Sequence, residues 1–161
     1  MEGAPAPVSP STHEECWPLM RQVLYQHLSA DGRELRQGLG PDGAYFAARA
    51  ADGEVVGTAT VRRQRPPWPE SELGCFRVRG MAVAPGRRLA GIGSALLRAC
   101  LAHVAERGAG VVWVNARVAA LGLYLRAGFQ PVSLPWADPV TGPHVSARLV
   151  VAGPGQPPGI A

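Results

Sequence analysis

Residues 75–114 constrain the fold more than any other part of the chain. The stretch CFRVRGMAVA at 75–84 alternates in polarity, which is typical of a strand, and a proline follows it. Apolar residues then recur at helical spacing up to Val104, and Gly108 suits the left-handed conformation that often ends a helix. The apolar run VVWV at 111–114 is typical of a short buried strand. Strand, helix and strand in this order predict a crossover unit within an α/β domain.

The segments on either side of this unit complete the predicted order of elements. They are bounded by turn residues, and comprise a strand pair at 44–50 and 54–63 around an Asp-Gly turn, a helix at 118–127 capped by Gly128, and closing strands at 129–134 and 144–151. The prolines of 64–74 predict a loop. We therefore expect a mixed α/β fold that begins with antiparallel strands.

A further helix is expected near the N-terminus, from Ser11 to about Leu28. Ser11 and Glu14 have the spacing of a capping box. Pro18 lies too deep for that start, so either the helix kinks there or the main helix begins at Pro18.

The length of 161 residues predicts one domain. We place it at residues 11–152, because 1–10 and 153–161 are rich in proline and glycine and are expected to be flexible. No apolar run reaches the length that crosses a bilayer, and the N-terminus lacks the pattern of a secretory signal.

The cysteines and the charges exclude several classes of protein. Cys16, Cys75 and Cys100 are odd in number and widely spaced, which argues against a disulfide framework or a zinc site and fits a reducing cytoplasm. The net charge of +4 rests on scattered arginines, since the sequence contains no lysine. A nucleic-acid-binding face is therefore not indicated, whereas a modest positive field suits an anionic ligand.

The glycine-rich junction RRLAGIGSALL, at 87–97, has the properties of an anion-binding site. The first N–H groups of a helix lack intrahelical partners, glycines let a ligand approach the backbone, and arginines bind phosphate oxygens. A dinucleotide-binding GxGxxG motif is excluded, because Leu96 stands at the third glycine position. A nucleotide-triphosphatase loop is excluded, because Ile92 and Gly93 replace its lysine and hydroxyl residue.

A third phosphate-binding pattern, Arg-x-x-Gly-x-Gly, is present as Arg88, Gly91 and Gly93, directly after a strand that ends Val-Ala-Pro. This resembles the pyrophosphate-binding motif of the GNAT superfamily, the acetyl-CoA-dependent N-acyltransferases. The family pattern continues with a second helix that ends in Tyr-x-x-x-Gly-Phe, which is present here at 124–129. Both segments occur in the expected order and at the expected separation.

Two further segments place the resemblance nearest to an ElaA-like branch of that family. NAR at 115–117 ends a strand, and TGPHV at 141–145 precedes the last strand, as in that branch. The whole resemblance spans about residues 44–151.

The resemblance implies a mixed central sheet with an antiparallel N-terminal half, splayed central strands and helices on both faces. It also implies acetyl-CoA as co-substrate and no metal. Pantetheine would bind the strand before the glycine-rich junction, and the diphosphate would bind helix N–H groups with Arg87 or Arg88. Asn115 would orient the pantetheine or a water molecule, or else cap the following helix. The implied cofactor-binding residues are Met81, Ala82, Val83, Arg87, Arg88, Leu89, Ala90, Gly91, Ile92, Gly93, Ser94 and Asn115.

The implied reaction is attack of an unprotonated amine on a thioester. Tyr124, which the family places beside the sulfur, would protonate the leaving thiolate, and a backbone N–H of the preceding strand would stabilise the carbonyl oxygen. The base stays open between Glu70, Glu72, His144 and water. His144 joins Tyr124 as a catalytic candidate, because imidazole titrates near neutrality and the family's last strands flank the acceptor site.

Each candidate also has an ordinary structural interpretation. Tyr124 suits a core aromatic residue, His144 a partly buried residue at a strand end, and Arg87 a solvated surface cation. Trp68 and Trp136 would either line an acceptor pocket or anchor loops.

The predicted function is direct transfer of the acetyl group of acetyl-CoA to an amino group of a small molecule or peptide in the cytoplasm. The alternative is a catalytically silent coenzyme A binding or sensing module of the same fold. Neither nucleic acid nor membrane is a predicted partner. Members of the family often dimerise through their last strands, so a homodimer is a possible assembly.

Overall fold

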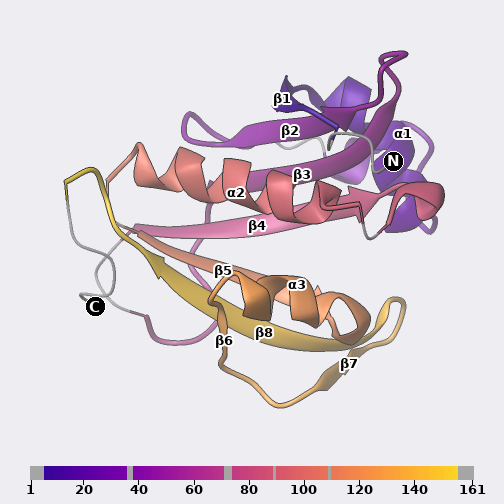
Figure 1. Cartoon of the computed structure of the whole chain (residues 1–161). Coiled ribbons are helices and arrows are strands. Elements are labelled where there is room, and N and C mark those ends of the chain that lie inside the picture. The colour runs from indigo at the N-terminus through magenta and orange to yellow at the C-terminus, as the bar shows by residue number, and fades with distance from the viewer. Residues whose placement is uncertain (1–5, 36–37, 71–73, 89, 109, 156–161) are drawn as a thin grey trace. The chain divides into compact units, whose positions relative to one another are not determined.

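The chain folds into a mixed α/β structure, which confirms the predicted fold class. The computed structural model describes residues 6–35, 38–70, 74–88, 90–108 and 110–155 (Figure 1). Among these residues the α-helices are α1 (His13–Val23), α2 (Ile92–Ala105) and α3 (Leu121–Arg126). The strands are β1 (Val8–Ser11), β2 (Ala44–Arg49), β3 (Val55–Arg63), β4 (Gly74–Val83), β5 (Gly110–Arg117), β6 (Gln130–Pro131), β7 (Trp136–Asp138) and β8 (Gly142–Val151). They form one open mixed sheet in the order β1-β2-β3-β4-β5-β8-β6, and β7 also pairs with β8.

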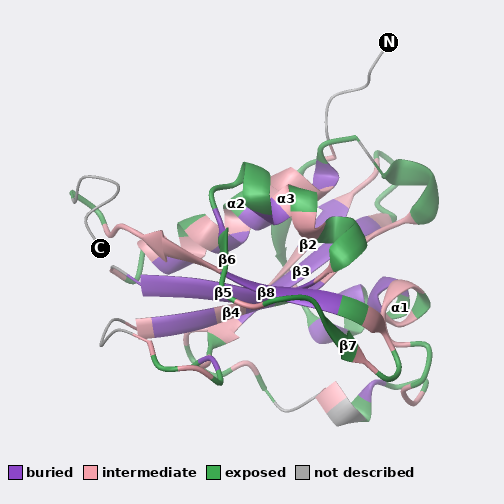
Figure 2. Ribbon diagram, turned by 90° about the horizontal axis from the view of Figure 1, so that it is seen from below, coloured by how far each residue is buried: buried purple, intermediate pink, exposed green. Residues whose placement is uncertain are grey.

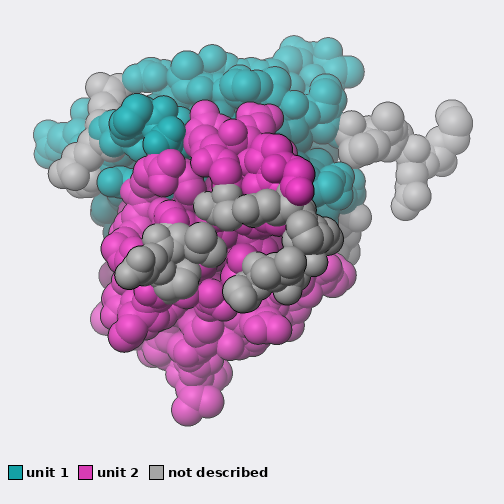
Figure 3. Space-filling model, turned by 90° about the vertical axis from the view of Figure 1, so that its left-hand side faces the viewer, with its two compact units in different colours: residues 1–62, 80–100 teal, residues 63–79, 101–161 magenta. Residues whose placement is uncertain are grey.

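The structure divides into two compact units, which Figure 3 shows in separate colours. The first unit comprises residues 1–62 and 80–100, and the second comprises residues 63–79 and 101–161. The boundaries fall inside β4 and α2, so each of these elements contributes residues to both units. The single domain expected over residues 11–152 stays a prediction.

In the first unit, β1, β2 and β3 form an antiparallel ladder. β2 pairs with β3 along its whole length, and Gly53 adopts a left-handed φ of 89° in the connecting turn, as the Asp-Gly sequence predicts. β1 pairs with β2, although residues 8–10 belong to the segment that was expected to be flexible. The proline content of that segment is compatible with β1 because an edge strand tolerates a residue without an N–H, and Pro10 lies in this edge strand.

α1 begins later than the sequence predicts. Thr12, rather than Ser11, is the N-cap residue, and its Oγ1 accepts a hydrogen bond from the Glu15 N–H at 3.2 Å. The predicted pair of Ser11 and Glu14 is therefore wrong by one position. The physical reason is that Ser11 is already the last residue of β1, where it pairs with Tyr45.

α1 also ends earlier than predicted, at Val23 instead of near Leu28, and it continues through Pro18. The Trp17 indole N–H donates to the Ala30 carbonyl at 2.8 Å, which ties the following segment back to the helix. This hydrogen bond joins residues that are 13 positions apart, so no local sequence pattern predicts it.

α1 and α2 lie on opposite faces of the sheet in the first unit (Figures 1 and 2). A Cβ at Gly57 would lie 2.6 Å from Ile92 Cγ2, so α2 packs directly on this point of β3. A Cβ at Gly80 would lie 2.9 Å from Met20 Cε and 3.5 Å from Thr60 Cγ2. Gly57 and Thr60 are an odd number of residues apart on β3, and so face opposite sides of it.

In the second unit, β5 pairs with β8 in antiparallel register from Gly110↔Val151 to Arg117↔His144. β5 is therefore longer than the predicted VVWV run. β6 is shorter than the predicted strand at 129–134, and the short strand β7 was not predicted. α3 lies against one face of β5 and β8 (Figure 1). Its C-terminal glycine, Gly128, has a φ of 99° and packs near Leu149, and so confirms the predicted cap.

Candidate functional site

The junction between β4 and α2 leaves backbone N–H groups without intrahelical partners. The Ala84 N–H donates to Val56 O at 2.9 Å, which anchors the end of β4 on β3. At the start of α2, the Ala95 N–H donates to Gly91 O at 3.1 Å. The N–H groups of residues 92–94 lie in the first turn of the helix, where N–H groups have no partner within the helix itself.

Glycines set the position of this helix start. Gly91 has a φ of 76°, and a Cβ there would meet no atom within 4 Å, so its requirement is backbone conformation rather than space. At Gly57, by contrast, a Cβ would lie 2.6 Å from Ile92 and 2.8 Å from Leu96. The absence of a side chain at Gly57 therefore lets the first turns of α2 rest directly on β3.

The helix start is electrostatically suited to an anion. The first turn of α2 contains no acidic residue. Arg87 and Arg88 precede it, both are exposed, and neither forms an ion pair with any residue that the structure describes. The N–H groups of the first helical turn and the helix dipole add positive potential at the same point. The residues at this helix start thus fit a bound diphosphate. Leu89, which was also predicted to bind it, lies outside the described residues.

The strand before this junction carries the other cofactor-binding candidates. β4 and β5 pair in parallel over Gly74–Arg77 and Gly110–Trp113, and this ladder does not extend to Met81, Ala82 and Val83. Gly80 interrupts the regular strand with a φ of 63°, and its carbonyl accepts a hydrogen bond from Thr58 Oγ1 at 2.8 Å. Residues 81–83 therefore follow a glycine in the left-handed region, which marks an irregularity within the strand.

Tyr124 lies on α3 and is 3% exposed. Its ring meets Phe129 edge to face, with centroids 5.5 Å apart, and the Phe129 N–H donates to the Tyr124 carbonyl at 3.0 Å. The Tyr-x-x-x-Gly-Phe pattern thus forms a folded unit in which Gly128 lets the chain turn back so that the two rings meet.

His144 stacks on Trp136, with ring centroids 4.9 Å apart and an interplanar angle of 19°. Its Nδ1 lies 2.8 Å from the Gly142 carbonyl oxygen. A carbonyl oxygen can only accept, so Nδ1 carries the proton and donates, and in the neutral ring Nε2 is then the basic nitrogen. His144 is 8% exposed, which combines burial with a defined tautomer.

Asn115 is joined to this cluster through Ser146. The Ser146 Oγ donates to Asn115 Oδ1 at 2.8 Å and accepts from Trp136 Nε1 at 3.2 Å. The predicted alternative, in which Asn115 caps the following helix, differs from the structure: Arg117 is the N-cap residue of the helical segment that precedes α3, and it makes no side-chain capping bond.

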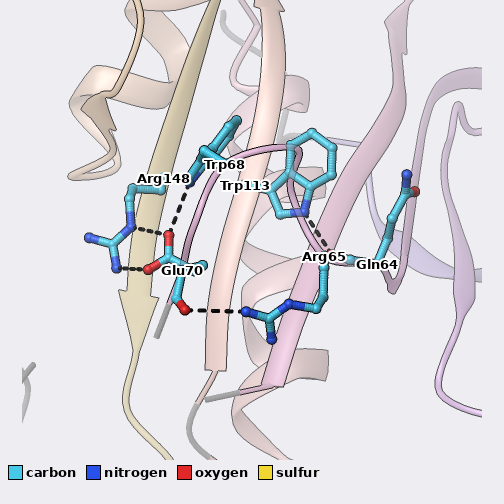
Figure 4. A network of polar contacts seen from close by, with 6 residues as sticks. All are labelled: Gln64, Arg65, Trp68, Glu70, Trp113 and Arg148. Carbon is cyan, nitrogen blue, oxygen red and sulfur yellow. Dashed lines mark hydrogen bonds and ion pairs between the residues drawn. The ribbon is translucent and has the colours of Figure 1, made fainter. Parts of the chain in front are cut away.

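Glu70 is held in an ion pair instead of facing solvent. Its side chain is 7% exposed and binds Arg148, with Nε to Oε2 at 2.7 Å and Nη2 to Oε1 at 2.9 Å (Figure 4). Trp68 Nε1 donates to the same carboxylate at 3.2 Å, and its ring meets Trp113 edge to face. Glu70 and Trp68 therefore anchor the 64–70 loop, while Glu72 lies outside the described residues.

The candidate residues fall into two groups. The strand and junction candidates, at 81–83 and 87–94, belong to the first unit, whereas Asn115, Tyr124 and His144 belong to the second. Sequence reasoning missed two polar residues of β8 that bind candidates: Ser146, which bonds Asn115, and Arg148, which bonds Glu70. The available signal was the alternation of His, Ser and Arg at 144, 146 and 148, which puts these side chains on one face of the strand.

Within the residues that the structure describes, no group of three or more His, Cys, Asp or Glu side chains could hold a metal ion. No helix in the described ranges has the length and apolar character needed to cross a membrane.

Comparisons with known proteins add independent observations. The model of the acetyltransferase (GNAT) family matches residues 10–129. An uncharacterized N-acetyltransferase of Bacillus subtilis, YitI, is 27% identical over 132 residues, which cover 82% of this chain and 87% of that protein. Streptothricin acetyltransferase of Streptomyces lavendulae is 34% identical over 115 residues, which cover 70% of this chain and 58% of that protein.

The fold has close counterparts among solved structures. An aminoglycoside 6'-N-acetyltransferase complexed with coenzyme A superposes with a TM-score of 0.71 at 14% identity, covering 93% of this chain and 99% of that one. This likeness concerns the fold, whereas the family model covers most of the sequence, including the Arg-x-x-Gly-x-Gly and Tyr-x-x-x-Gly-Phe segments. The chain belongs to the acetyltransferase (GNAT) family.

Proposed function

We propose that this protein transfers the acetyl group of acetyl-CoA to the amino group of a polar small molecule or a peptide. The observation that carries the proposal is the start of α2, where N–H groups at 92–94, the helix dipole and two exposed arginines coincide without a competing acidic side chain. Such an arrangement suits the diphosphate of coenzyme A.

The binding roles follow from the chemistry of each segment. Arg87 or Arg88 binds the phosphate oxygens, and the N–H groups of residues 90–94 bind the diphosphate. Backbone groups of Met81, Ala82 and Val83 bond the pantetheine amides as a neighbouring strand would, because the β5 ladder does not reach them. The side-chain amide of Asn115, on β5, orients the pantetheine or a water molecule.

The chemical roles belong to two side chains of the second unit. Acetyl-CoA supplies a thioester whose C–S bond breaks as the amine nitrogen forms a bond to the acetyl carbon. His144 accepts the proton of the amine at Nε2, the nitrogen that its bond to the Gly142 carbonyl leaves basic. Tyr124 donates its phenol proton to the departing sulfur and recovers a proton from solvent.

The relatives indicate where to look for the acceptor. One of them is a streptothricin acetyltransferase, and one structural counterpart is an aminoglycoside 6'-N-acetyltransferase. We therefore propose polar small molecules that carry primary amines as the first acceptors to test, followed by polyamines and peptide N-termini.

The test separates binding from turnover. Acetyl-CoA raises the melting temperature of the wild-type protein, and we expect this protection to vanish when Arg88→Ala is combined with Gly91→Val, each variant being compared with its own ligand-free melt. Arg98→Ala, an exposed arginine further along α2, is the matched control and keeps the protection. Undiminished protection of the double variant would place the cofactor elsewhere.

Turnover is measured as thiol release from acetyl-CoA with glucosamine, spermidine, kanamycin and a short peptide. Thiol release that depends on one of these amines supports the proposed acetyl transfer. Thermal protection by coenzyme A without release from any amine would favour a binding or sensing module of the same fold.

A further inference from the structure

Trp136 makes two different contacts with the cluster that contains His144 and Asn115. Its ring stacks on the imidazole of His144, with centroids 4.9 Å apart. Its indole N–H donates to Ser146 Oγ at 3.2 Å. Trp136 pairs directly with His144 across β7 and β8, which brings both contacts to one face of the second unit. Trp136 as a residue is nevertheless 37% exposed, so it lies at the surface of that cluster.

The indole determines the direction of the hydrogen-bond chain. An indole N–H can only donate, so Ser146 Oγ accepts from Trp136. The Ser146 hydroxyl then directs its own proton to Asn115 Oδ1 at 2.8 Å. Asn115 consequently uses its carbonyl oxygen inside the protein, and its amide nitrogen makes no hydrogen bond to any residue that the structure describes. The two N–H donors of the Asn115 side-chain amide therefore point away from Ser146.

The same tryptophan limits the motion of the imidazole. The ring of His144 is bounded by Trp136 on one face and by the Gly142 carbonyl at Nδ1. Gly142 has a φ of 86°, and the preceding turn is closed by Asp138, whose carboxylate accepts from the N–H groups of Val140 and Thr141. These N–H groups lower the pKa of Asp138, so it stays ionised and keeps the turn closed. The hairpin of β7 and β8 thus holds one orientation of the ring.

We propose that Trp136 is a positioning residue that fixes both His144 and Asn115, the first by ring stacking and the second through Ser146. This inference rests on the proposed acetyl transfer. In it, His144 Nε2 takes the amine proton, and the Asn115 amide donates to an oxygen of the substrates. Because Trp136 contacts His144 through its ring and Ser146 through its N–H, we expect the loss of each contact to cause a different kinetic defect.

Trp136→Phe keeps an aromatic ring against His144 and removes the N–H donor. Ser146→Ala cuts the same chain without touching the ring. We expect both variants to raise KM for the best amine of the probe set, or for acetyl-CoA, by about three- to tenfold with little change in kcat, as for loss of one neutral hydrogen bond. Trp136→Phe combined with Ser146→Ala is expected to match the single variants, since both act on one chain.

Trp136→Leu removes the ring as well as the donor. We expect it to show the same rise in KM and, in addition, a fall in kcat, because the imidazole is no longer held. Asn115→Asp keeps an oxygen that accepts from Ser146 but loses the N–H donors, and is expected to raise KM at least as much as Ser146→Ala. Wild-type KM in Trp136→Phe, or additive effects in the Trp136/Ser146 double variant, would overturn the role of the chain.

The tautomer of His144 is a readout that does not depend on knowing the acceptor. Nitrogen-15 spectra of the imidazoles, with His144→Gln to identify the signal among the four histidines, should show Nδ1–H in the wild type and in Trp136→Phe. Trp136→Leu should show a mixture of tautomers. A single Nδ1–H form in Trp136→Leu would overturn the stacking role. If no amine is acetylated, the proposed function fails, whereas these spectra still decide whether Trp136 orients the ring.

Discussion

Arg148 holds the carboxylate of Glu70 with two hydrogen bonds, at 2.7 and 2.9 Å, although the residues are 78 positions apart in the sequence. Trp68 adds a third donor to the same carboxylate, and Arg65 donates to the backbone carbonyl of Glu70 at 3.2 Å (Figure 4). A carboxylate engaged in this way serves as an anchor between the 64–70 loop and β8, and we do not assign it as the base.

Glu70→Ala is therefore expected to lower the free energy of unfolding by about 2–3 kcal/mol, because Arg148 would be left partly buried without its partner. Denaturant unfolding measures this loss. Glu106→Ala is the control, since Glu106 is 76% exposed and its ion pair with Arg107 should contribute little. A Glu70→Ala protein of native stability that has lost activity would instead identify Glu70 as a chemical group.

Gly57→Ala is expected to displace the start of α2 from β3. The new methyl group would lie 2.6 Å from Ile92 and 2.8 Å from Leu96, and overpacking of this kind costs about 1–3 kcal/mol. We also expect weaker thermal protection by acetyl-CoA, because the N–H groups of the helix start move with the helix. Gly86→Ala has no atom within 4 Å of its Cβ and should behave as the wild type in both assays.

Tyr124→Phe should slow thiol release by about 10²-fold while leaving the protection by coenzyme A nearly intact. The ring is retained, so its edge-to-face contact with Phe129 persists and the fold is preserved. Tyr25→Phe, which removes a phenol hydroxyl from the first unit, is the control and should keep full turnover. Equal turnover of Tyr124→Phe and the wild type would remove Tyr124 from the mechanism.

The buried thiol of Cys100 is expected to make the free energy of unfolding fall at alkaline pH. Complete burial raises the pKa of its thiol to about 12, so the folded protein keeps the neutral thiol while the unfolded chain ionises above its ordinary pKa of 9.0. The raised pKa therefore stabilises the fold below pH 9, and this contribution falls as the pH rises from 9 towards 12, by about 1 kcal/mol for each pH unit. Unfolding free energies of wild type and Cys100→Ala across this range check it. Parallel curves for the two proteins would contradict the assignment.

Local patterns were sufficient for the central elements of the fold. The alternating strand was predicted within a residue of β4, and the helix predicted from Gly91 to about Arg107 is α2, which ends two residues earlier, at Ala105. Gly108 has the predicted left-handed φ, because each of these features depends on neighbours within a few residues. β1 and the start of α1 were predicted wrongly, because Pro10 by itself indicates a loop. The strand exists because it pairs with β2, and this pairing cannot be seen in the local sequence. The weak strand β7 likewise exists only because it pairs with β8.

The sequence by itself determined the family, the glycine-rich helix start and the tyrosine of the second motif, since each is written in residues that are close together in the chain. Only the tertiary structure decided what surrounds the remaining candidates. It placed Glu70 against Arg148 and the ring of His144 against Trp136, and it joined Asn115 to Ser146. These partners meet through strand register and loop packing. The alternation at 144, 146 and 148 puts the side chains of β8 on one face, but it does not say which residues they meet, because the same side chains could have faced solvent without changing any pattern around them.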